Sequence, residues 1–493
     1  MTQSSMPLYT AEQIKTGEQN IVEELNIDMF ELMMKAGQGV FSHLQALYPD
    51  VNSLQIYCGT GNNGGDGYVV AQLALLSGYS VTVVQLGDSE KVTGHANIAQ
   101  KLWLEAGGQI TQFDNYQPVN DGLIIDALVG TGLKGSLSDA YVKAVHSIND
   151  SDLDVISIDV PSGLCSDTGE VFNKCVKASH TICLIGLKRG LFTGHAAEYS
   201  GKIILDDLSI SPDLSQLDGS NCYLLTKQVI EGCLSPRRKT AHKGQNGRVL
   251  CLGGDRGMFG AIRLASEACM RVGAGLTRVV TQPENVSALV SARPEVMVFD
   301  WRGNSSEIND HLWWADVIAL GPGLGNSSWG RSLVGYSRTA EKPMVVDADG
   351  LNILAKTPDF NGRRVITPHP GEAARLLNST VEEVEQDRFA TARALQLKYG
   401  GVVVLKGAGT IVYNGDRFWV CGAGNPGMAS GGMGDVLTGV IAGLIAQGFT
   451  ISQAAIIGVW VHSTAADQCA KKEGERGLLA SDLFPYIRQL VNL

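Results

Sequence analysis

Short apolar, β-branched runs that end in Gly-rich or polar loops recur along almost the whole chain. The 493 residues include 59 glycines, well above the roughly 7% of average composition, and many of them follow these runs directly. Stretches with the helical spacing of apolar residues come after the loops. Strands and helices that alternate in this way build a parallel sheet with ligand-binding loops at the carboxyl ends of its strands. The sequence therefore predicts an α/β protein.

Length and charge limit the class of protein further. A chain of 493 residues is too long for one ordinary domain, so two or three are expected. The composition, 44% hydrophobic and 18% charged, is typical of a globular protein with large cores. A formal net charge of −11 disfavours nucleic acid or an anionic membrane as the main partner. Simple solubility is the alternative explanation of that charge.

Neither a targeting segment nor a metal motif is evident. The first 20 residues contain no apolar core of a signal peptide, and no uninterrupted apolar run reaches membrane-spanning length. The ten cysteines are scattered, and no pair has the two-residue spacing of a zinc or redox motif. We therefore expect reduced thiols, no membrane partner and a cytoplasmic location.

The first part of the chain shows one Gly-rich loop with unusual polar residues. Apolar residues at helical spacing predict helices over residues 14–25 and 29–44. A buried strand is expected at 54–58, then the loop 59–67, then a helix at 68–76. Strand, Gly-rich loop and helix in this order make a dinucleotide or phosphate cradle. Asn62, Asn63 and Asp66 inside the loop add oxygens that suit a monovalent cation or a polar substrate.

Two further strand ends carry carboxylates. A strand at 122–125 is expected to end at Asp126, and one at 155–158 at Asp159, with Ser162 three residues later. Residues just past the ends of parallel strands meet at one edge of a sheet, so these side chains and Asn63 are predicted to surround one site. The alternative is structural: both aspartates would be helix N-caps, and Ser162 would form a turn.

The periodicity lapses between residues 211 and 245 and then resumes. A basic run at 237–239 lies in this segment, where a solvated linker is preferred over a nucleotide-steering patch. Beyond it, strands are predicted at residues 249–252, 317–320, 344–346, 365–366 and 402–405, with a helix at 262–272. Each strand ends in a Gly-rich or polar loop, so a second parallel sheet with its own ligand edge is expected.

The loop at residues 425–435 precedes the apolar stretch 436–446 and holds mostly Gly, Ala and Ser in its second half. Unobstructed backbone N–H groups at the start of a helix suit a phosphate. A carboxylate beside bound phosphate is electrostatically unfavourable unless it accepts a proton, so Asp435 is interpreted as a general base. An N-cap in a Gly-rich loop is the alternative.

This loop resembles the anion hole and base of the ribokinase-like small-molecule kinases. Together with the segments 347–352 and 367–372 it is more similar to one branch, the NAD(P)H-hydrate dehydratases. The motifs of the first part resemble the epimerase domain of the same repair enzymes. The resemblance implies a Rossmann-like three-layer domain at 1–215 and a ribokinase-like α/β domain at 216–493. It also implies epimerisation of R and S NAD(P)HX by the first domain and ADP-dependent dehydration of the S form by the second, releasing AMP and phosphate.

The resemblance assigns residues in the first domain one by one. Potassium would lie near Asn63, Asp126 and Ser162. Asp159 is implied as the proton-handling residue, with Lys188 a weaker candidate because a lysine at a strand end is usually solvated or faces a phosphate. The implied substrate contacts are Asn62, Asn63, Gly64, Gly65, Asp66, Gly130, Thr131, Gly132, Leu133, Lys134, Gly135, Ser136 and Asp159.

In the second domain, Asp435 is the implied catalytic base, and Mg²⁺ is the implied metal. Hydrated nicotinamide would contact Ala261, Gly323, His369 and Asp435. The implied ADP contacts are Lys406, Gly407, Ala408, Gly409, Thr410, Asn425, Pro426, Gly427, Met428, Ala429, Ser430, Gly431, Gly432, Met433 and Gly434. A homo-oligomer is expected, although no pattern in the sequence specifies it. Two alternatives stay open: a vitamin or sugar kinase with an accessory domain, and a first domain that binds without catalysis.

Overall fold

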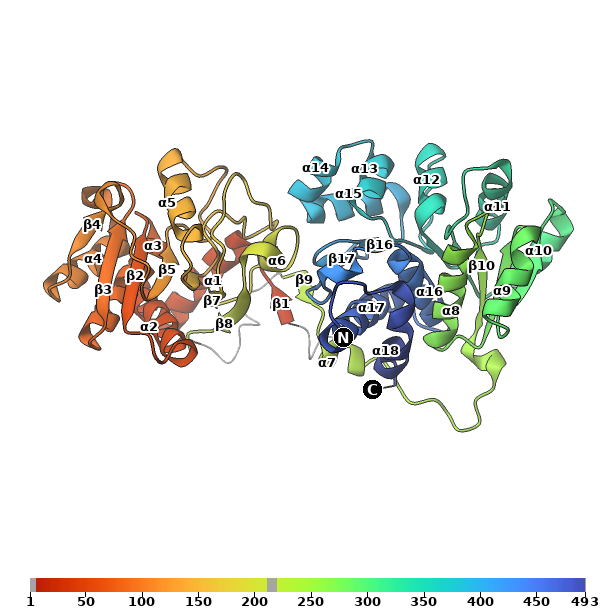
Figure 1. Cartoon of the computed structure of the whole chain (residues 1–493), viewed down its shortest axis with the longest axis horizontal. Coiled ribbons are helices and arrows are strands. Elements are labelled where there is room, and N and C mark those ends of the chain that lie inside the picture. The colour runs from red at the N-terminus through yellow and green to blue at the C-terminus, as the bar shows by residue number, and fades with distance from the viewer. Residues whose placement is uncertain (1–5, 211–219, 493) are drawn as a thin grey trace. The chain divides into compact units, whose positions relative to one another are not determined.

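A computed structural model of the chain describes residues 6–210 and 220–492 (Figure 1). These residues divide into two compact units, one formed by Pro7–Cys222 and the other by Met6 and the chain from Tyr223 onward. The predicted boundary between residues 215 and 216 lies outside the described residues. Within the described residues, none of the helices has both the length and the apolar character that crossing a membrane requires.

The N-terminal unit is built on a seven-stranded, fully parallel sheet in the order β4-β3-β2-β5-β6-β7-β8. Its strands are β2 (Ser53–Cys58), β3 (Ser80–Gln85), β4 (Ile110–Gln112), β5 (Leu123–Ala127), β6 (Val155–Ile158), β7 (His180–Leu184) and β8 (Lys202–Asp206). Its helices are α1 (Ala11–Leu25), α2 (Met29–Leu47), α3 (Asn62–Leu76), α4 (Gly94–Glu105), α5 (Asp139–Asn149) and α6 (Ala196–Tyr199).

Alternating residues of the central strands enter two different cores. In β2, Leu54, Ile56 and Cys58 pack with residues of α2, α3 and α4, whereas Tyr57 packs on the opposite face with residues of α5. Successive side chains of a strand point to opposite faces, so both faces of this sheet are covered. The predicted three-layer, Rossmann-like arrangement is confirmed.

The second sheet has eleven strands in the order β1-β9-β18-β17-β16-β15-β14-β13-β10-β11-β12, and all of them except β1 lie chiefly in the C-terminal unit. The strands from β10 to β16 pair in parallel, and β16, β17 and β18 pair antiparallel. The strands are β1 (Met6–Leu8), β9 (Cys222–Leu224), β10 (Arg248–Leu252), β11 (Leu276–Thr281), β12 (Met297–Asp300), β13 (Val317–Leu320), β14 (Met344–Val346), β15 (Arg364–Ile366), β16 (Val402–Leu405), β17 (Thr410–Tyr413) and β18 (Phe418–Cys421).

Helices pack on this sheet, and Figure 1 shows α16, late in the chain, beside the much earlier α8. They are α7 (Lys227–Glu231), α8 (Phe259–Arg271), α9 (Val286–Ala292), α10 (Ser305–Trp314), α11 (Ser328–Arg338), α12 (Ala348–Lys356), α13 (Pro370–Leu377), α14 (Val381–Gln386), α15 (Arg388–Tyr399), α16 (Met433–Ala446), α17 (Ile451–Glu473) and α18 (Leu483–Leu490). Helices α8, α16, α17 and α18 share one hydrophobic core with the sheet.

Two glycines let α16 approach α8 closely. A Cβ on Gly439 would lie 2.1 Å from the carbonyl oxygen of Ala265, and one on Gly443 would lie 2.8 Å from that of Cys269. Both distances are too short for a side-chain carbon, so only glycine permits this backbone contact. The two helices therefore pack as one block, with the start of α16 held against α8.

The expected strands of the second unit are confirmed to within a residue at each end, but three expectations in or near the loops were wrong. Helix α3 begins at Asn62 instead of residue 68, and α8 begins at Phe259 instead of residue 262. Asp126 lies inside β5 and not past its end. Glycine-rich segments were interpreted as loops, whereas in α3 the glycines allow the first helical turns to pack closely on neighbouring strands.

Candidate active sites

Asp159 and Lys188 form a buried ion pair in the N-terminal unit. Asp159 directly follows β6 and has a left-handed backbone conformation, with φ of 68°. The Lys188 ammonium contacts Oδ1 of Asp159 and donates to the carbonyl of Leu184 at 2.7 Å. The Lys188 side chain is only 1% exposed, so the expectation of a solvated lysine was wrong. Burial lowers the pKa of Lys188, but Asp159, with smaller contributions from Cys183 and Glu18, outweighs this effect and raises the pKa above its usual value.

Two more carboxyl groups lie in the electrostatic range of this pair. Burial raises the pKa of Asp66 well above its ordinary value, and the charges of Asp159 and Glu18 raise it further. Burial also raises the pKa of Glu18, assisted by Asp159 and opposed by Lys188. The cluster therefore holds three carboxyl groups and one ammonium, an arrangement able to store and move a proton. Glu18 lies in α1, where no motif marks it, and the sequence analysis missed it.

Asp126 and Ser162 come together as predicted, but in the core. The Asp126 carboxylate is fully buried and accepts from Ser162 Oγ at 2.6 Å, Ser162 N at 2.9 Å, Ser157 Oγ at 2.8 Å and Leu128 N at 3.3 Å. Burial raises the pKa of Asp126, and these hydrogen bonds lower it in part. Neither aspartate caps a helix, so the N-cap alternative was wrong. Asp126 instead ties the end of β5 to the segment after β6.

Asn63 and Gly130 connect this network to Asp159. A Cβ placed on Gly130 would lie 3.1 Å from Asn63 Oδ1 and 3.5 Å from Asp159 Oδ2. The Asn63 side-chain nitrogen is buried and has no hydrogen-bond partner among the described residues. Buried amides normally find a partner, so this one is available to a ligand.

The remaining predicted contacts of the N-terminal site differ in accessibility. Gly64 and Gly65 are buried in α3, and neither position has room for a side chain. A Cβ on Gly64 would lie 2.1 Å from the carbonyl oxygen of Gly59, and a Cβ on Gly65 would lie 2.7 Å from Met33 Cε. Asn62 is exposed, and the loop from Thr131 to Ser136 alternates between exposed and half-buried residues. The loop is therefore open to a substrate, whereas the two glycines can contribute only backbone atoms.

Oxygen atoms predominate around Ser162, which bears on the predicted cation. Ser162 Oγ lies 2.6 Å from Asp126 Oδ1 and 3.1 Å from the carbonyl oxygen of Val129. One carboxylate with hydroxyl, amide and carbonyl oxygens is a hard, weakly charged donor set that fits a large monovalent cation better than Mg²⁺. The residues present therefore fit potassium in donor chemistry.

In the C-terminal unit, Asp435 is the third residue of α16, whose N-cap is Gly432 with φ of 93°. Burial and the charge of Asp347 raise the pKa of Asp435 to about 7, Lys406 opposes them, and Asp349 and Glu372 add to the rise. A carboxyl group that titrates near neutrality is matched to general-base catalysis. The first turn of a helix would favour the ionised form of Asp435, so burial and the surrounding carboxylates together outweigh the helix dipole.

Lys406 links the groups around Asp435. Its ammonium lies 2.8 Å from Asp347 Oδ1 and 3.7 Å from Glu372 Oε2, and the other oxygen of Asp347 accepts from Thr438 Oγ1 at 2.8 Å. Burial raises the pKa of Asp347, but Lys406 and Thr438 outweigh it and hold the pKa below its usual value. Asp347 therefore stays ionised beside the carboxyl of Asp435, as coupled carboxyl groups at a proton-transfer site require.

The predicted nicotinamide contacts form two groups beside this network. A Cβ on Gly323 would lie 3.3 Å from Ala261 Cβ, and the nearby Gly325 N–H donates to Asp349 Oδ2 at 2.9 Å. His369 is the N-cap of α13, and its Nε2 lies 3.7 Å from Glu372 Oε1. Burial lowers the pKa of His369, Glu372 opposes this, and Lys406 adds to it. The imidazole is therefore neutral at pH 7 and able to accept or donate a hydrogen bond.

Glycines keep the two predicted nucleotide loops clear of side chains. A Cβ on Gly434 would lie 3.1 Å from Lys406 Nζ, whereas Gly431 faces open space. In the other loop, a Cβ on Gly407 would lie 2.8 Å from the Arg388 guanidinium, which donates to the carbonyl of Lys406 at 3.0 Å. Arg388 is buried and thus fixes the position from which Lys406 reaches the site.

Hydrogen bonds anchor the loop at residues 425–434 at its start and near its middle. Asn425 Nδ2 donates to Asp467 Oδ1 at 2.8 Å, and Asn425 Oδ1 accepts from Gly427 N at 3.1 Å. Ser430 Oγ donates to the carbonyl of Leu478 at 3.1 Å. The anchors hold the loop in place ahead of α16, while its central glycine remains exposed.

One side chain of α17 near this site was also missed. His462 is buried, its Nε2 has no partner among the described residues, and burial lowers its pKa to about 4. Helical apolar spacing hides a single histidine, so the sequence gave no signal for it. Among the described residues, no group of three or more His, Cys, Asp or Glu side chains is arranged to hold a metal ion.

Comparisons with known proteins agree with this two-site arrangement. A family model described as "NAD(P)H-hydrate dehydratase" matches residues 249–489, and one described as "YjeF-related protein N-terminus" matches residues 29–190. A bifunctional NAD(P)H-hydrate repair enzyme of Vibrio cholerae is 48% identical over 99% of both chains. The chain belongs to the bifunctional NAD(P)H-hydrate repair enzymes.

Other relatives of this repair enzyme agree. The bifunctional NAD(P)H-hydrate repair enzyme of Escherichia coli is 42% identical over 98% of this chain and 94% of its own. A solved ribokinase-like superfamily protein of Enterococcus faecalis covers 56% of this chain and 96% of its own, with 29% identity and a TM-score of 0.52. The predicted ribokinase-like second domain and the predicted bifunctional epimerase and dehydratase are confirmed.

Proposed function

We propose that the N-terminal site interconverts the R and S forms of NADHX and NADPHX, and that the C-terminal site dehydrates the S form with ADP as phosphoryl donor. The products of the second reaction are NAD(P)H, AMP and phosphate. The observation that carries this proposal is a carboxyl of pKa about 7 at the start of α16, beside a lysine and open glycines.

Phosphoryl transfer explains why a dehydratase uses a kinase fold. Hydroxide is a poor leaving group at neutral pH, so the hydroxyl of the hydrated ring is first phosphorylated and then leaves as phosphate. The ring nitrogen lone pair assists this departure, and loss of a ring proton restores the double bond. In phosphoryl transfer the protein contributes mainly position and charge.

Asp435 would accept the proton of the substrate hydroxyl as the phosphoryl group arrives. The ionised Asp347 disfavours a second negative charge on Asp435 and thereby strengthens it as a base, while Lys406 moderates this effect. The backbone N–H groups of residues 431–434 would stabilise the charge on the transferred group. Gly323, Ala261 and His369 would contact the nicotinamide.

In the N-terminal site, Asp159 and Lys188 would handle the proton of the epimerisation. Their close contact fixes the geometry, and the raised pKa values of Glu18 and Asp66 supply further proton-holding groups. Asn63, Asp126 and Ser162 would hold potassium. When bound, the ion would supply positive charge at the sheet edge that receives the dinucleotide.

Mg²⁺ and the cellular location complete the proposal. Mg²⁺ commonly uses one or two carboxylates together with substrate phosphates, which fits a site without a dedicated cluster of protein ligands among the described residues. All ten cysteines are unpaired and eight lie buried, as is usual in a reducing compartment, and this supports a cytoplasmic location. Assembly as a homo-oligomer stays a prediction.

The deciding assay is incubation of purified protein with NADHX, ADP and Mg²⁺ in potassium buffer. We expect the absorbance of reduced nicotinamide to return and AMP to form in equal amount. Asp435→Asn should lower the rate by at least about 10²-fold, because an amide cannot accept the proton. Asp467→Asn is the matched control: it makes the same change of carboxylate to amide at the residue that anchors the loop through Asn425, away from the proposed base. Stable phosphorylation of a vitamin or sugar without NADH formation would contradict the proposal.

Potassium is tested separately in the epimerisation alone. Rates are compared in potassium, sodium and tetramethylammonium buffers at equal ionic strength. We expect a clear advantage for potassium, because the oxygen set suits a large monovalent ion. Equal rates in the three buffers would rule out a functional cation at Asn63, Asp126 and Ser162.

A further inference from the structure

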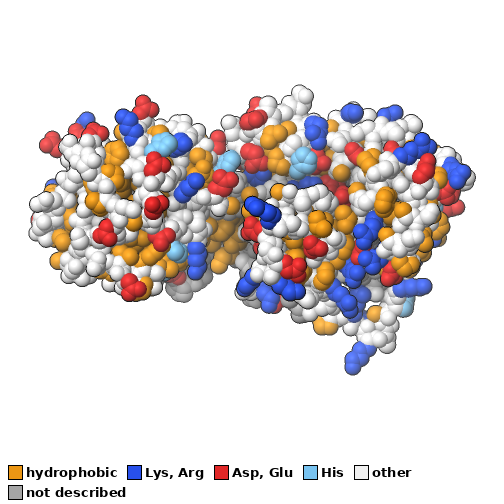
Figure 2. Space-filling model, viewed as in Figure 1, with side chains coloured by type: hydrophobic (Ala, Val, Ile, Leu, Met, Phe, Trp, Pro, Cys, Tyr) orange, Lys and Arg blue, Asp and Glu red, His pale blue; other side chains and the backbone are white. Residues whose placement is uncertain are grey.

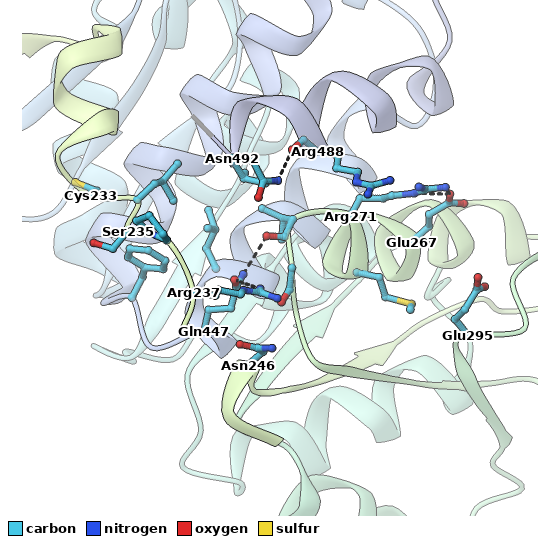
Figure 3. A pocket seen from close by; sticks show the side chains of 18 of the residues that line it. Cys233, Ser235, Arg237, Asn246, Glu267, Arg271, Glu295, Gln447, Arg488 and Asn492 are labelled. Carbon is cyan, nitrogen blue, oxygen red and sulfur yellow. Dashed lines mark hydrogen bonds and ion pairs between the residues drawn. The ribbon is translucent and has the colours of Figure 1, made fainter. Parts of the chain in front are cut away.

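The C-terminal unit has a cavity of about 670 Å³ that contains none of the proposed catalytic or nucleotide contacts. Residues at the ends of α8 and α18, the turn after α16 and the segment from Cys233 to Arg237 line it (Figure 3). Its volume is in the usual range for small-molecule sites. The side chains in this cavity have no role in the two proposed reactions.

Charge in the cavity is concentrated around one buried carboxylate. Glu267 is only 2% exposed, and its oxygens lie 3.2 Å from Arg263, 3.1 Å from Arg271 and 2.5 Å from Arg293. One carboxylate thus faces three guanidinium groups, of which those of Arg271 and Arg293 line the cavity. A single negative charge cannot balance three positive ones, so the cluster retains excess positive charge.

Arg488 adds to this excess. Its side chain is exposed on α18 and runs beside that of Arg271 in Figure 3. Four arginines and two glutamates line the cavity in total, which leaves a formal charge of +2. Figure 2 shows Lys and Arg side chains gathered on the lower part of the C-terminal unit. This positive surface contrasts with the chain's net charge of −11.

These arginines are not needed as hydrogen-bond donors to the carbonyls at the ends of α8 and α16. Arg237 donates to the carbonyl of Gly273 and to Gln447 Oε1, and Gln447 Nε2 donates to the carbonyls of Val272 at 3.2 Å and Gly443 at 2.8 Å. The carbonyls that end α8 and α16 therefore have donors. Arg271 and Arg488 lie in the last turns of α8 and α18, where positive charge is favoured, and Arg271 and Arg293 share the single carboxylate of Glu267. The guanidinium groups of Arg271, Arg293 and Arg488 therefore keep donors that the helix-end carbonyls do not use.

Apolar side chains form another part of the lining, among them Leu234, Pro236, Met270, Leu444 and Phe449. Together with the arginines they match a ligand that has an anionic end and an organic body. We propose that this cavity is a second ligand site, which binds a small molecule through a phosphoryl group held by Arg271, Arg293 and Arg488. Guanidinium groups bind phosphoryl oxygens in paired hydrogen bonds, and the apolar lining would contact the rest of the molecule.

The test counts ligands on the full-length protein by equilibrium dialysis with radiolabelled ADP, and in parallel with radiolabelled inorganic phosphate. We expect two ADP equivalents per chain, one in each site of the C-terminal unit. Arg488→Glu should weaken the second equivalent about tenfold or more and leave the first unchanged. Tighter binding of ADP than of phosphate would identify an organic phosphate as the ligand, and equal affinity would identify a free phosphate.

Two further variants keep the outcome clear. Arg271→Gln should act in the same direction as Arg488→Glu, and it avoids a new charge beside Glu267. Arg302→Glu reverses an exposed arginine outside the cavity and is the matched control, expected to keep both equivalents. One ADP per chain in the unmodified protein, without phosphate binding, would overturn the proposal. A second equivalent that survives both cavity variants would do the same.

Discussion

The titration of Asp435 gives the sharpest test of the dehydratase mechanism. A general base must be ionised, and the pKa of Asp435 is raised to about 7. About one molecule in eleven is then ionised at pH 6 and about ten in eleven at pH 8. We therefore expect kcat for dehydration to rise about tenfold between these two values, with ADP saturating and the supplied substrate already in the S form.

Neighbouring charges should shift the acidic limb of this profile, the rise of kcat between pH 6 and pH 8, in opposite directions. Lys406 lowers the pKa of Asp435 and Asp349 raises it. Lys406→Gln should therefore shift the limb to higher pH, and Asp349→Asn should shift it to lower pH. The assay is kcat against pH for the three proteins. A profile that is flat from pH 6 to 8, or that moves in the same direction in both variants, would refute the assignment.

The same carboxyl has a consequence for stability. Its pKa is raised in the folded state, so between about pH 4 and 7 the folded protein binds more protons than the unfolded one, and stability falls as pH rises through this range. Removing the charge should relieve this cost. Asp435→Asn is expected to stabilise the protein at pH 8 by on the order of 2 kcal/mol, after allowance for its partial exposure. Calorimetry at pH 8 and pH 4 checks this, since the gain should vanish at pH 4.

Three further predictions concern the N-terminal unit. Asp126→Ala should destabilise it by about 3 kcal/mol in chemical denaturation, because the donors of Ser162 and its neighbours lose a buried acceptor; unchanged stability would contradict this. Lys188→Met should abolish epimerisation while dehydration of S-NADHX continues, and a normal rate of R-to-S conversion would remove Lys188 from the mechanism. Cleavage between residues 211 and 219 should release two folded units, of which the C-terminal one consumes only the S form; consumption of both forms at equal rates would leave the first unit without an epimerase role.

The regular alternation of apolar runs and loops made the strands predictable. The positions of polar residues buried among those strands were harder to predict. The pattern of apolar runs locates β13 and β14 to the residue. Asp126 was expected past a strand end because the apolar run of residues 122–125 stops there. Ser157 and Ser162 reverse that expectation by surrounding it with donors, which a linear pattern does not reveal.

The loops that form the candidate sites were predictable from the sequence, but the contacts between particular side chains were not. Asp347, Glu372 and Lys406 each stand in a motif that the sequence singles out, yet Lys406 and Asp347 are separated by 59 positions. Which carboxylate the lysine contacts depends on the order of strands in the sheet. Glu18 was missed for a related reason, since α1 reaches the Asp159 site only through the fold.

The backbone contact between α8 and α16 bears on how the dehydratase site can change. Ala261 is the third residue of α8 and Asp435 is the third residue of α16, so a proposed nicotinamide contact and the proposed base lie in the first turns of the same closely packed pair of helices. Gly439, one turn beyond the base, determines how far apart those first turns stand. A methyl group at this buried position would widen the site without altering a residue that touches substrate. Acceptance of a bulkier substrate could therefore evolve through a substitution in the core, at a position that does not line the site.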